Sequence, residues 1–298
     1  MLRFISLGIC CGVVLIVAVV LNGCGGGGMM GSPVPSSRAH PPSSSSGSLT
    51  LGPLTPEPTA STQRWMDLAN NLYATAFASS FGYPRTGVTL HYTTGQTSLQ
   101  FGVTALAGTL KPNFCYQMKL VGPSVAWPKK NPRTTDFTNY ALGSNGRWYD
   151  QTQNMNLTDS QLSSHVGDLI TGYLYFDFLV TAADGSVNYT STVNNSYHVT
   201  FMTTQQARTR NDGPLRACTV TAPLISAAYS GLTYPTVVVT LYAQQEPGRS
   251  LPGKLTLPSG TYSGVQFVLT EESFHSTDPL GGNWDTVMAA TMPDFTLK

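Results

Sequence analysis

Charge is the scarcest feature of this sequence. Only 10% of its 298 residues are Asp, Glu, Lys or Arg, against about 25% in an average soluble domain. The formal net charge is +1, and the one compact basic group is Lys129-Lys130 with Arg133 nearby. Nucleic-acid binding depends on clustered basic side chains that neutralise phosphates. We therefore predict no nucleic-acid partner.

Motifs of the common enzyme classes are also missing. The chain has no Gly-x-Ser-x-Gly elbow, no His-Glu-x-x-His zinc motif, no phosphate-binding loop and no dinucleotide fingerprint. This absence favours a binding protein over an enzyme without excluding catalysis, and no cofactor is predicted.

The N-terminus carries an export signal. Arg3 precedes an apolar run over residues 8–21, which ends in Leu21-Asn22-Gly23-Cys24. These residues resemble the lipobox of bacterial lipoproteins, although Asn22 is unusual at its position. In that family a diacylglycerol is attached to the cysteine, and a peptidase cuts before it. The resemblance implies a signal peptide at 1–23, lipid on Cys24 and membrane attachment through that lipid.

An uncleaved membrane anchor is the alternative, because residues 4–21 carry no charge and approach the length of a spanning helix. Both interpretations place the body outside the cytoplasm. Gly25 stands where an aspartate would signal inner-membrane retention, so the resemblance implies the outer membrane, facing the periplasm or the surface. Residues 24–61, rich in Gly, Ser and Pro, are expected to form a tether.

Residues 62–298 are predicted to form one mainly β domain. Apolar residues alternate with polar ones at 88–92, 99–103, 114–120 and 197–201, which predicts strands. Residues 236–242 and 265–270 are predicted to be further strands. Residues 173–180 form a continuous apolar run, typical of a strand that is covered on both faces. Asp184-Gly185 follows as a predicted hairpin turn, after which residues 187–193 could pair back. Helical spacing predicts a helix over residues 62–76, and Thr158 with Gln161 forms a capping box for a second one. Residues 122–157 are expected to be irregular.

The segment from Leu110 through Pro112-Asn113 to Tyr116 resembles the tyrosine corner of fibronectin type III and related immunoglobulin-like domains. The resemblance implies an antiparallel immunoglobulin-like β-sandwich with one or two short helices. Residues 173–180, 196–199 and 269–284 also resemble those of uncharacterised bacterial and archaeal surface proteins, a likeness that implies no activity.

Two cysteines remain in the domain once Cys24 and the signal peptide are set aside. Cys115 and Cys218 could form a disulfide in an exported compartment. Equally, they could be two buried thiols in separate strands. The sequence leaves both alternatives open.

A candidate polar site follows the strand at 265–270. It holds Glu271, Glu272 and His275, whose carboxylates and imidazole could bind a metal or exchange protons. A solvated loop is the favoured alternative. The oxygen-rich residues 150–159 resemble a calcium loop only in composition, since Met155 stands where an EF-hand needs glycine.

Asp177 is unusual because it interrupts the apolar run at 173–180, where a charge is costly unless it is paired. His198 and Arg147 are candidate partners, which would add Asp177 and His198 to the polar site. A hydrogen bond from the backbone or a tyrosine hydroxyl is the favoured alternative.

Aromatic residues near glycines could form a stacking platform for sugar rings. The candidates are Trp127, Trp148, Tyr149 and Trp284. The alternative is that they fill the ends of the core.

Together these features predict a membrane-anchored, extracytoplasmic lipoprotein that acts as a non-enzymatic binding or envelope-interaction module. Its ligand would be a protein or a carbohydrate. The alternatives are a metal-binding or metal-dependent protein that uses residues 271–275, and a structural component of an envelope assembly.

Overall fold

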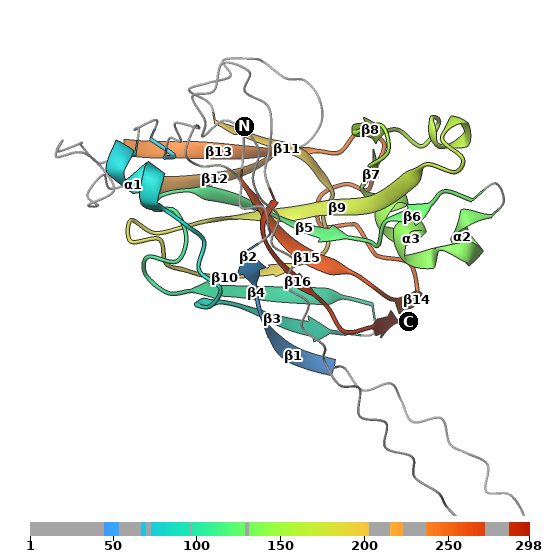
Figure 1. Cartoon of the computed structure of the whole chain (residues 1–298), viewed down its shortest axis with the longest axis horizontal. Coiled ribbons are helices and arrows are strands. Elements are labelled where there is room, and N and C mark those ends of the chain that lie inside the picture. The colour runs from blue at the N-terminus through green and yellow to red at the C-terminus, as the bar shows by residue number, and fades with distance from the viewer. Residues whose placement is uncertain are drawn as a thin grey trace, which may run out of the picture. The chain divides into compact units, whose positions relative to one another are not determined.

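The structure is a computed structural model. It describes residues 45–53, 67–69, 73–95, 97–128, 131–202, 215–222, 237–271 and 286–298. Antiparallel strands dominate the described residues, as the alternating sequence predicts (Figure 1). The mainly β fold with short helices is confirmed, and the layered packing of its sheets is consistent with a β-sandwich. The strand orders do not establish the immunoglobulin-like topology, which stays a prediction.

A four-stranded sheet has the order β1-β3-β4-β10. Its strands are β1 (Ser45–Thr50), β3 (Val88–Thr94), β4 (Leu99–Ala105) and β10 (Val187–Thr192). Side chains alternate between buried and more exposed positions along β3 and β4, because a β-strand directs successive side chains to opposite faces. This sheet therefore offers one apolar face to the rest of the molecule.

The largest sheet has the order β2-β16-β15-β5-β9-β7-β8, and β6 also pairs with β9. Its strands are β2 (Gly52–Pro53), β5 (Cys115–Val121), β6 (Val125–Ala126), β7 (Arg147–Asp150), β8 (Met155–Leu157), β9 (Leu169–Val180), β15 (Gln266–Glu271) and β16 (Thr286–Thr291). Nearly every residue of β5 and β9 is buried. The apolar run at 173–180 is thus covered on both faces, as predicted.

A third sheet has the order β11-β13-β12, with β11 (Tyr197–Met202), β12 (Leu215–Ala222) and β13 (Val237–Gln245). A two-stranded sheet pairs β14 (Gly260–Tyr262) with β17 (Phe295–Leu297). None of the helices among the described residues combines the length and apolar character that a membrane crossing requires.

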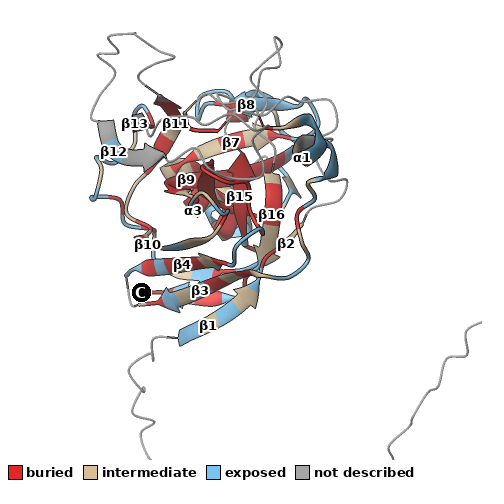
Figure 2. Ribbon diagram, turned by 90° about the vertical axis from the view of Figure 1, so that its left-hand side faces the viewer, coloured by how far each residue is buried: buried red, intermediate tan, exposed pale blue. Residues whose placement is uncertain are grey.

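Two apolar clusters hold these sheets together. In the larger one, Phe101 of the four-stranded sheet contacts Phe176 and Phe267 of the largest sheet. In the smaller one, Tyr175 of β9 packs in the same cluster as Leu241 of β13. The largest sheet therefore lies between two others, and its buried strands occupy the middle of Figure 2.

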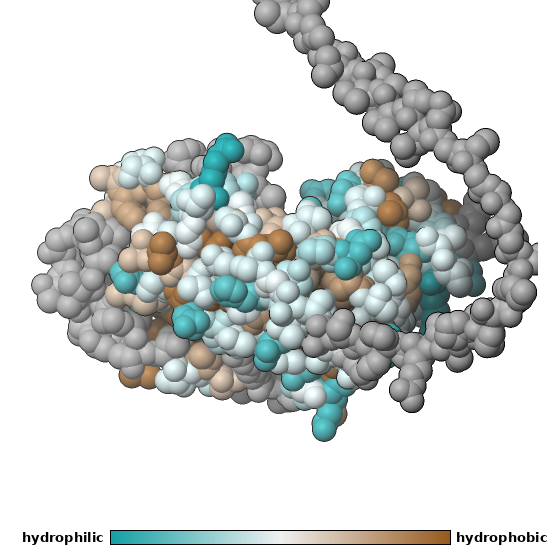
Figure 3. All heavy atoms as spheres, turned by 90° about the horizontal axis from the view of Figure 1, so that it is seen from below, coloured by the Kyte–Doolittle hydropathy of each residue, from teal (hydrophilic) through white to brown (hydrophobic). Residues whose placement is uncertain are grey.

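Among the described residues, the face of the molecule drawn in Figure 3 has no large charged or apolar patch. On the face drawn in Figure 3, residues of intermediate hydropathy prevail, and the strongly hydrophilic or hydrophobic ones are scattered among them. This surface agrees with the low charge content of the sequence.

The helices are short: α1 (Thr75–Ser80), α2 (Pro132–Thr135), α3 (Phe137–Asn145) and the 3₁₀ turn η1 (Leu162–Ser164). The Asp136 carboxylate caps α3 by accepting the Asn139 N–H, at 3.4 Å. A Cβ at Gly172 in β9 would collide with the Asn139 carbonyl, so the glycine lets α3 lie directly on that strand.

Three predictions of local structure are corrected. Of the described residues in the helix expected over 62–76, only 75–76 are helical, in α1. Residues 68–69 form a turn instead, whose Leu68 N–H bonds to the Asn113 carbonyl, at 2.9 Å. Residues 62–66 and 70–72 lie outside the described residues. The stretch 122–157, expected to be irregular, contains α2, α3, β6, β7 and β8. Residues 187–193, which could have paired back onto β9, instead contribute β10, which pairs with β4 in another sheet.

The predicted tether at 24–61 is too long. Ser45–Thr50 forms β1 against β3, and Leu51 is completely buried in the main cluster. Residues 45–53 therefore belong to the folded body, which begins before the predicted boundary at 62. Cys24 and residues 1–23 lie outside the described residues.

Candidate functional site

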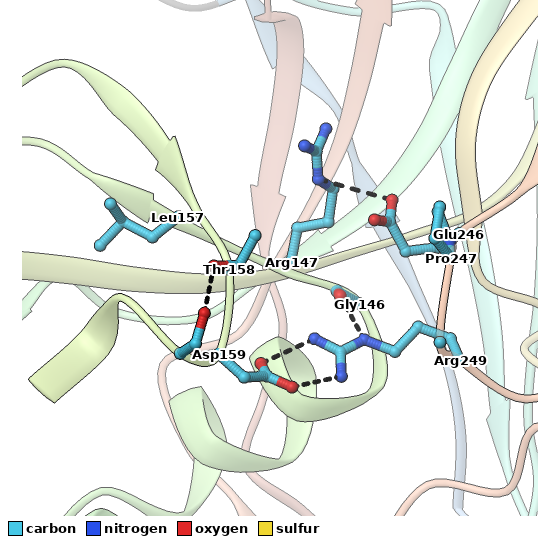
Figure 4. A pocket seen from close by; sticks show the side chains of 10 residues that line it. Gly146, Arg147, Leu157, Thr158, Asp159, Glu246, Pro247 and Arg249 are labelled. Atoms are coloured by element: carbon cyan, nitrogen blue, oxygen red, sulfur yellow. Dashed lines mark hydrogen bonds and ion pairs between the residues drawn. The ribbon is translucent and has the colours of Figure 1, made fainter.

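A pocket of about 340 Å³ opens beside the end of β13. Three separate segments form its wall, namely residues 146–147, 157–160 and 246–249 (Figure 4). The first begins β7, the second includes the end of β8, and the third follows β13. The pocket thus lies where an edge of the largest sheet meets the three-stranded sheet.

A tight turn places the third segment. The Arg249 N–H bonds to the Glu246 carbonyl, at 3.2 Å, and Gly248 has a φ of 74°. Proline at the second position and a glycine with positive φ at the third are typical of a type II turn. The turn brings both Glu246 and Arg249 to the lining of the pocket (Figure 4).

Arg249 joins the second segment to α3. Its guanidinium makes two bonds to the Asp159 carboxylate, at 2.6 and 2.8 Å. It also donates to the carbonyls of Gly146 and Gly143, at 2.8 and 3.2 Å, at the C-terminal end of α3. A cation stabilises that end of a helix, where carbonyls lack partners within the helix. Four hydrogen bonds therefore fix Arg249.

Asp159 is held in its ionised form. The hydrogen bonds from Arg249 lower the pKa of the Asp159 carboxyl, partial burial opposes that effect, and the bond from Trp148 lowers the pKa further. The Trp148 indole N–H donates to Asp159 Oδ1 at 2.7 Å. This wall of the pocket is thus anchored in the aromatic cluster below it.

The opposite wall carries a second ion pair. Arg147 Nε lies 3.4 Å from Glu246 Oε2, and His198 Nδ1 lies 3.0 Å from the same oxygen. The terminal nitrogens of Arg147 point away from Glu246 (Figure 4). Neighbouring Tyr173 has its pKa raised to about 12, chiefly by burial, so its hydroxyl stays protonated at neutral pH.

The charges that line the pocket balance. Two guanidinium groups, of Arg147 and Arg249, face two carboxylates, of Asp159 and Glu246. The hydroxyls of Thr158 and Ser160 add neutral donors and acceptors. The wall therefore presents donors beside acceptors, with no excess charge of either sign.

One other group could hold a metal ion. Among the described residues, Asp150, His165 and Asp168 have ligand atoms that all lie within 4.8 Å of one another. Sequence reasoning noted Asp150 only as part of an oxygen-rich loop and did not identify the two others. The spacing of His165 and Asp168 in one turn was the available signal.

The three described residues of the predicted polar site, Asp177, His198 and Glu271, have separate partners. His198 and Arg147, the proposed partners of Asp177, both contact Glu246 instead. Glu271 is 1% exposed and pairs with Lys111. Glu272 and His275 lie outside the described residues.

Hydroxyl and backbone groups surround Asp177. Tyr189 donates to its Oδ2 at 2.8 Å, Ser191 donates to the same oxygen at 2.5 Å, and the Phe178 N–H bonds to Oδ1 at 2.8 Å. The described contacts therefore support the structural hydrogen-bond alternative.

Cys115 and Cys218 form no disulfide in the structure. Cys115 is buried in the smaller apolar cluster, and Cys218 packs against that cluster from β12. The two thiols lie in separate strands, as in the second alternative, but only Cys115 is fully buried and Cys218 is partly buried.

The predicted stacking platform is wrong for its two described tryptophans. Trp127 and Trp148 are buried, and their rings meet edge to face at 4.8 Å in a cluster with Leu157. They fill the core beneath the pocket and offer no face to a ligand. Tyr149 hydrogen-bonds to Asn154, and Trp284 lies outside the described residues.

Sequence reasoning missed the pocket residues Glu246 and Arg249, and it noted Asp159 only as part of the oxygen-rich loop. Asp159 and Arg249 are 90 positions apart, so no local pattern connects them. The Pro247-Gly248 pair was the one available signal, since it predicts a turn directly after a strand.

Comparison with protein-family models, with curated proteins and with solved structures finds no match to this chain.

Proposed function

We propose that the protein is a lipid-anchored module of the cell envelope that binds a neutral, hydroxyl-rich ligand such as an oligosaccharide. The lipid on Cys24 would hold it to the outer membrane, and the folded body would bind rather than catalyse.

The anchoring half of the proposal rests on the sequence. An apolar run at 8–21 leads directly into Gly23-Cys24, which resembles a lipobox. Residues 25–28 are all glycine, a poor continuation of a membrane helix. Position, residue type and flanking sequence therefore favour lipid attachment over an uncleaved anchor.

The binding half rests on the balanced polar wall of the pocket. A sugar hydroxyl both donates and accepts hydrogen bonds. A wall that sets Arg147 beside Glu246, and Arg249 beside Asp159, can satisfy both roles at each hydroxyl. An ionic ligand would gain little there, because the positive and negative charges are equal in number. The pairing of opposite charges is the observation that carries this proposal.

Arrayed oligosaccharides of both neutral and acidic classes test the binding half, with full-length protein in detergent as the analyte. Arg147→Met removes a donor from the wall without disturbing the α3 carbonyls. We expect at least about 10-fold weaker binding to a neutral oligosaccharide, since a hydrogen bond from a charged group contributes about 1.5–3 kcal/mol.

Arg85→Met is the matched control, because Arg85 is exposed and does not line the pocket. It should bind as the unchanged protein does. Binding to acidic oligosaccharides alone, or equal binding by Arg147→Met and the control, would contradict the proposal.

A further inference from the structure

Three metal-ligating side chains converge beneath the turn that joins η1 to β9. Asp150 ends β7, His165 follows η1, and Asp168 immediately precedes β9. His165 Nδ1 lies 2.8 Å from Asp150 Oδ2 and 3.1 Å from Asp168 Oδ2. Three ligand atoms from two separate segments therefore point at one small volume.

The backbone fixes these segments relative to each other. The Asp168 N–H bonds to the His165 carbonyl at 3.1 Å, and the Gly167 N–H bonds to the Trp127 carbonyl at 3.0 Å. The Asp168 carbonyl in turn accepts the Trp127 N–H at 2.8 Å. His165 and Asp168 thus sit on a turn that is anchored to the strand region beside it.

Backbone N–H groups fix the orientation of the Asp150 carboxylate. Its Oδ1 accepts the N–H groups of Thr152 and Gln153, at 2.7 and 3.0 Å, and the residue is completely buried. These bonds turn the other oxygen, Oδ2, toward His165. Outer hydrogen bonds of this kind orient the carboxylates that bind metals.

His165 Nδ1 lies between the two carboxylates and faces an oxygen of each. A neutral imidazole whose proton is on Nε2 directs the lone pair of Nδ1 at this position. A cation among the three ligand atoms would then receive one lone pair from each of them.

We propose that Asp150 Oδ2, His165 Nδ1 and Asp168 Oδ2 bind a zinc ion. Zinc takes nitrogen and oxygen ligands in a tetrahedral arrangement with bonds of about 2.0–2.1 Å, so its ligand atoms lie roughly 3.3 Å apart. The separations of 2.8 and 3.1 Å need to grow by only a few tenths of an ångström.

The fourth position is open to water or to the side-chain amide of Gln153. Asp168 is 24% exposed and His165 is 11% exposed, so solvent reaches one side of the site. Gln153 lies 2.8 Å from Asp168 through its amide nitrogen, and rotating that amide by half a turn brings its oxygen there instead. The imidazole ligand favours zinc over calcium or magnesium, which prefer oxygen alone.

The test measures binding of zinc chloride to the full-length protein in detergent after treatment with a chelator and dialysis. Isothermal titration should find that one zinc ion binds per chain and that this binding requires the three ligands. Zinc should also raise the melting temperature, since it binds the native state. Calcium chloride should do neither.

His165→Gln and Asp168→Asn should each weaken zinc binding by about 100-fold or more, at least the loss seen when outer-shell partners are removed. His91→Gln is the matched control, because His91 is exposed on β3, away from the site. Circular dichroism checks the fold of each variant, and two variants keep the test decisive if one does not fold. Zinc binding that both variants retain, calcium binding in place of zinc, or no zinc binding at all would overturn the proposal.

Discussion

Replacing Lys111 by methionine should destabilise the protein by about 3–5 kcal/mol, because it leaves the Glu271 carboxylate in the core without its cation. Lys111 Nζ lies 2.5 Å from Glu271 Oε1, and the two side chains are 3% and 1% exposed. Glu271 Oε1 also accepts the Tyr83 hydroxyl, while Oε2 has no hydrogen-bond partner among the described residues. Aromatic rings enclose the ammonium, that of Phe114 at 5.2 Å.

The loss of stability arises because each single substitution leaves one charged group buried without its partner. Glu271→Leu should cost a similar amount, because the Lys111 ammonium then loses its carboxylate. If the two losses were independent, the double variant would lose about 6–10 kcal/mol, as much as the whole stability of many domains. Replacing both members of a buried pair with apolar groups is often neutral. We therefore expect Lys111→Met with Glu271→Leu to come within about 2 kcal/mol of the unchanged protein.

Urea unfolding of the four proteins at neutral pH gives the free energies for this double-mutant cycle. Lys254→Met is the matched control, since Lys254 is exposed, and it should change stability by less than about 0.5 kcal/mol. A double variant that loses the sum of the two single losses would refute the reasoning, because it would mean that the buried pair is not coupled.

Three more predictions follow from buried groups. A chain lacking residues 1–53 should melt at a clearly lower temperature than a chain lacking only residues 1–44. The longer deletion removes the Leu51 side chain from the core, and burial of such a side chain contributes about 1.5–3 kcal/mol. Equal melting temperatures would place Leu51 outside the core. Burial, followed by the charge of Glu271, raises the pKa of Tyr83 well above its usual value. Stability should therefore be intact below about pH 10, the unfolded value, and fall as pH rises beyond it, less steeply in Tyr83→Phe; identical alkaline unfolding curves would count against this burial. Asp177→Asn should destabilise the protein less than Asp177→Leu. Asn keeps an acceptor for the surrounding hydroxyls, whereas Leu leaves buried donors without an acceptor, which costs about 1–3 kcal/mol of stability. Equal losses of stability in urea unfolding would reject the hydrogen-bond role.

Local chemistry predicted several elements correctly. The Thr158 N–H and hydroxyl both bond to Gln161 Oε1, at 2.8 and 2.9 Å, so the predicted capping box does precede η1. The predicted turn at Pro112-Asn113 also has a local contact, because the Tyr116 hydroxyl accepts the Lys111 N–H beside it, at 2.9 Å. These features succeed because each depends on residues within five positions of one another.

Elements set by distant partners escaped prediction. Ser45–Thr50 has the composition of a linker, and pairing with β3 makes it a strand. The spacing at 62–76 predicts a helix, but Leu68 bonds through its N–H to the carbonyl of Asn113, 45 positions away. His198 was matched with Asp177, but β11 pairs with β13, whose end brings Glu246 to it. Sequence spacing carries no information about such pairings.

Metabolic labelling with a fatty-acid analogue tests the central claim most directly, which is that this protein is attached to a membrane through lipid on Cys24. The unchanged chain should incorporate the label and remain with the membrane fraction after cell breakage. Cys24→Ser should incorporate none, whereas Cys218→Ser, the matched control in the folded body, should be labelled like the unchanged chain. Continued labelling of Cys24→Ser, or no labelling of the unchanged chain, would contradict the account.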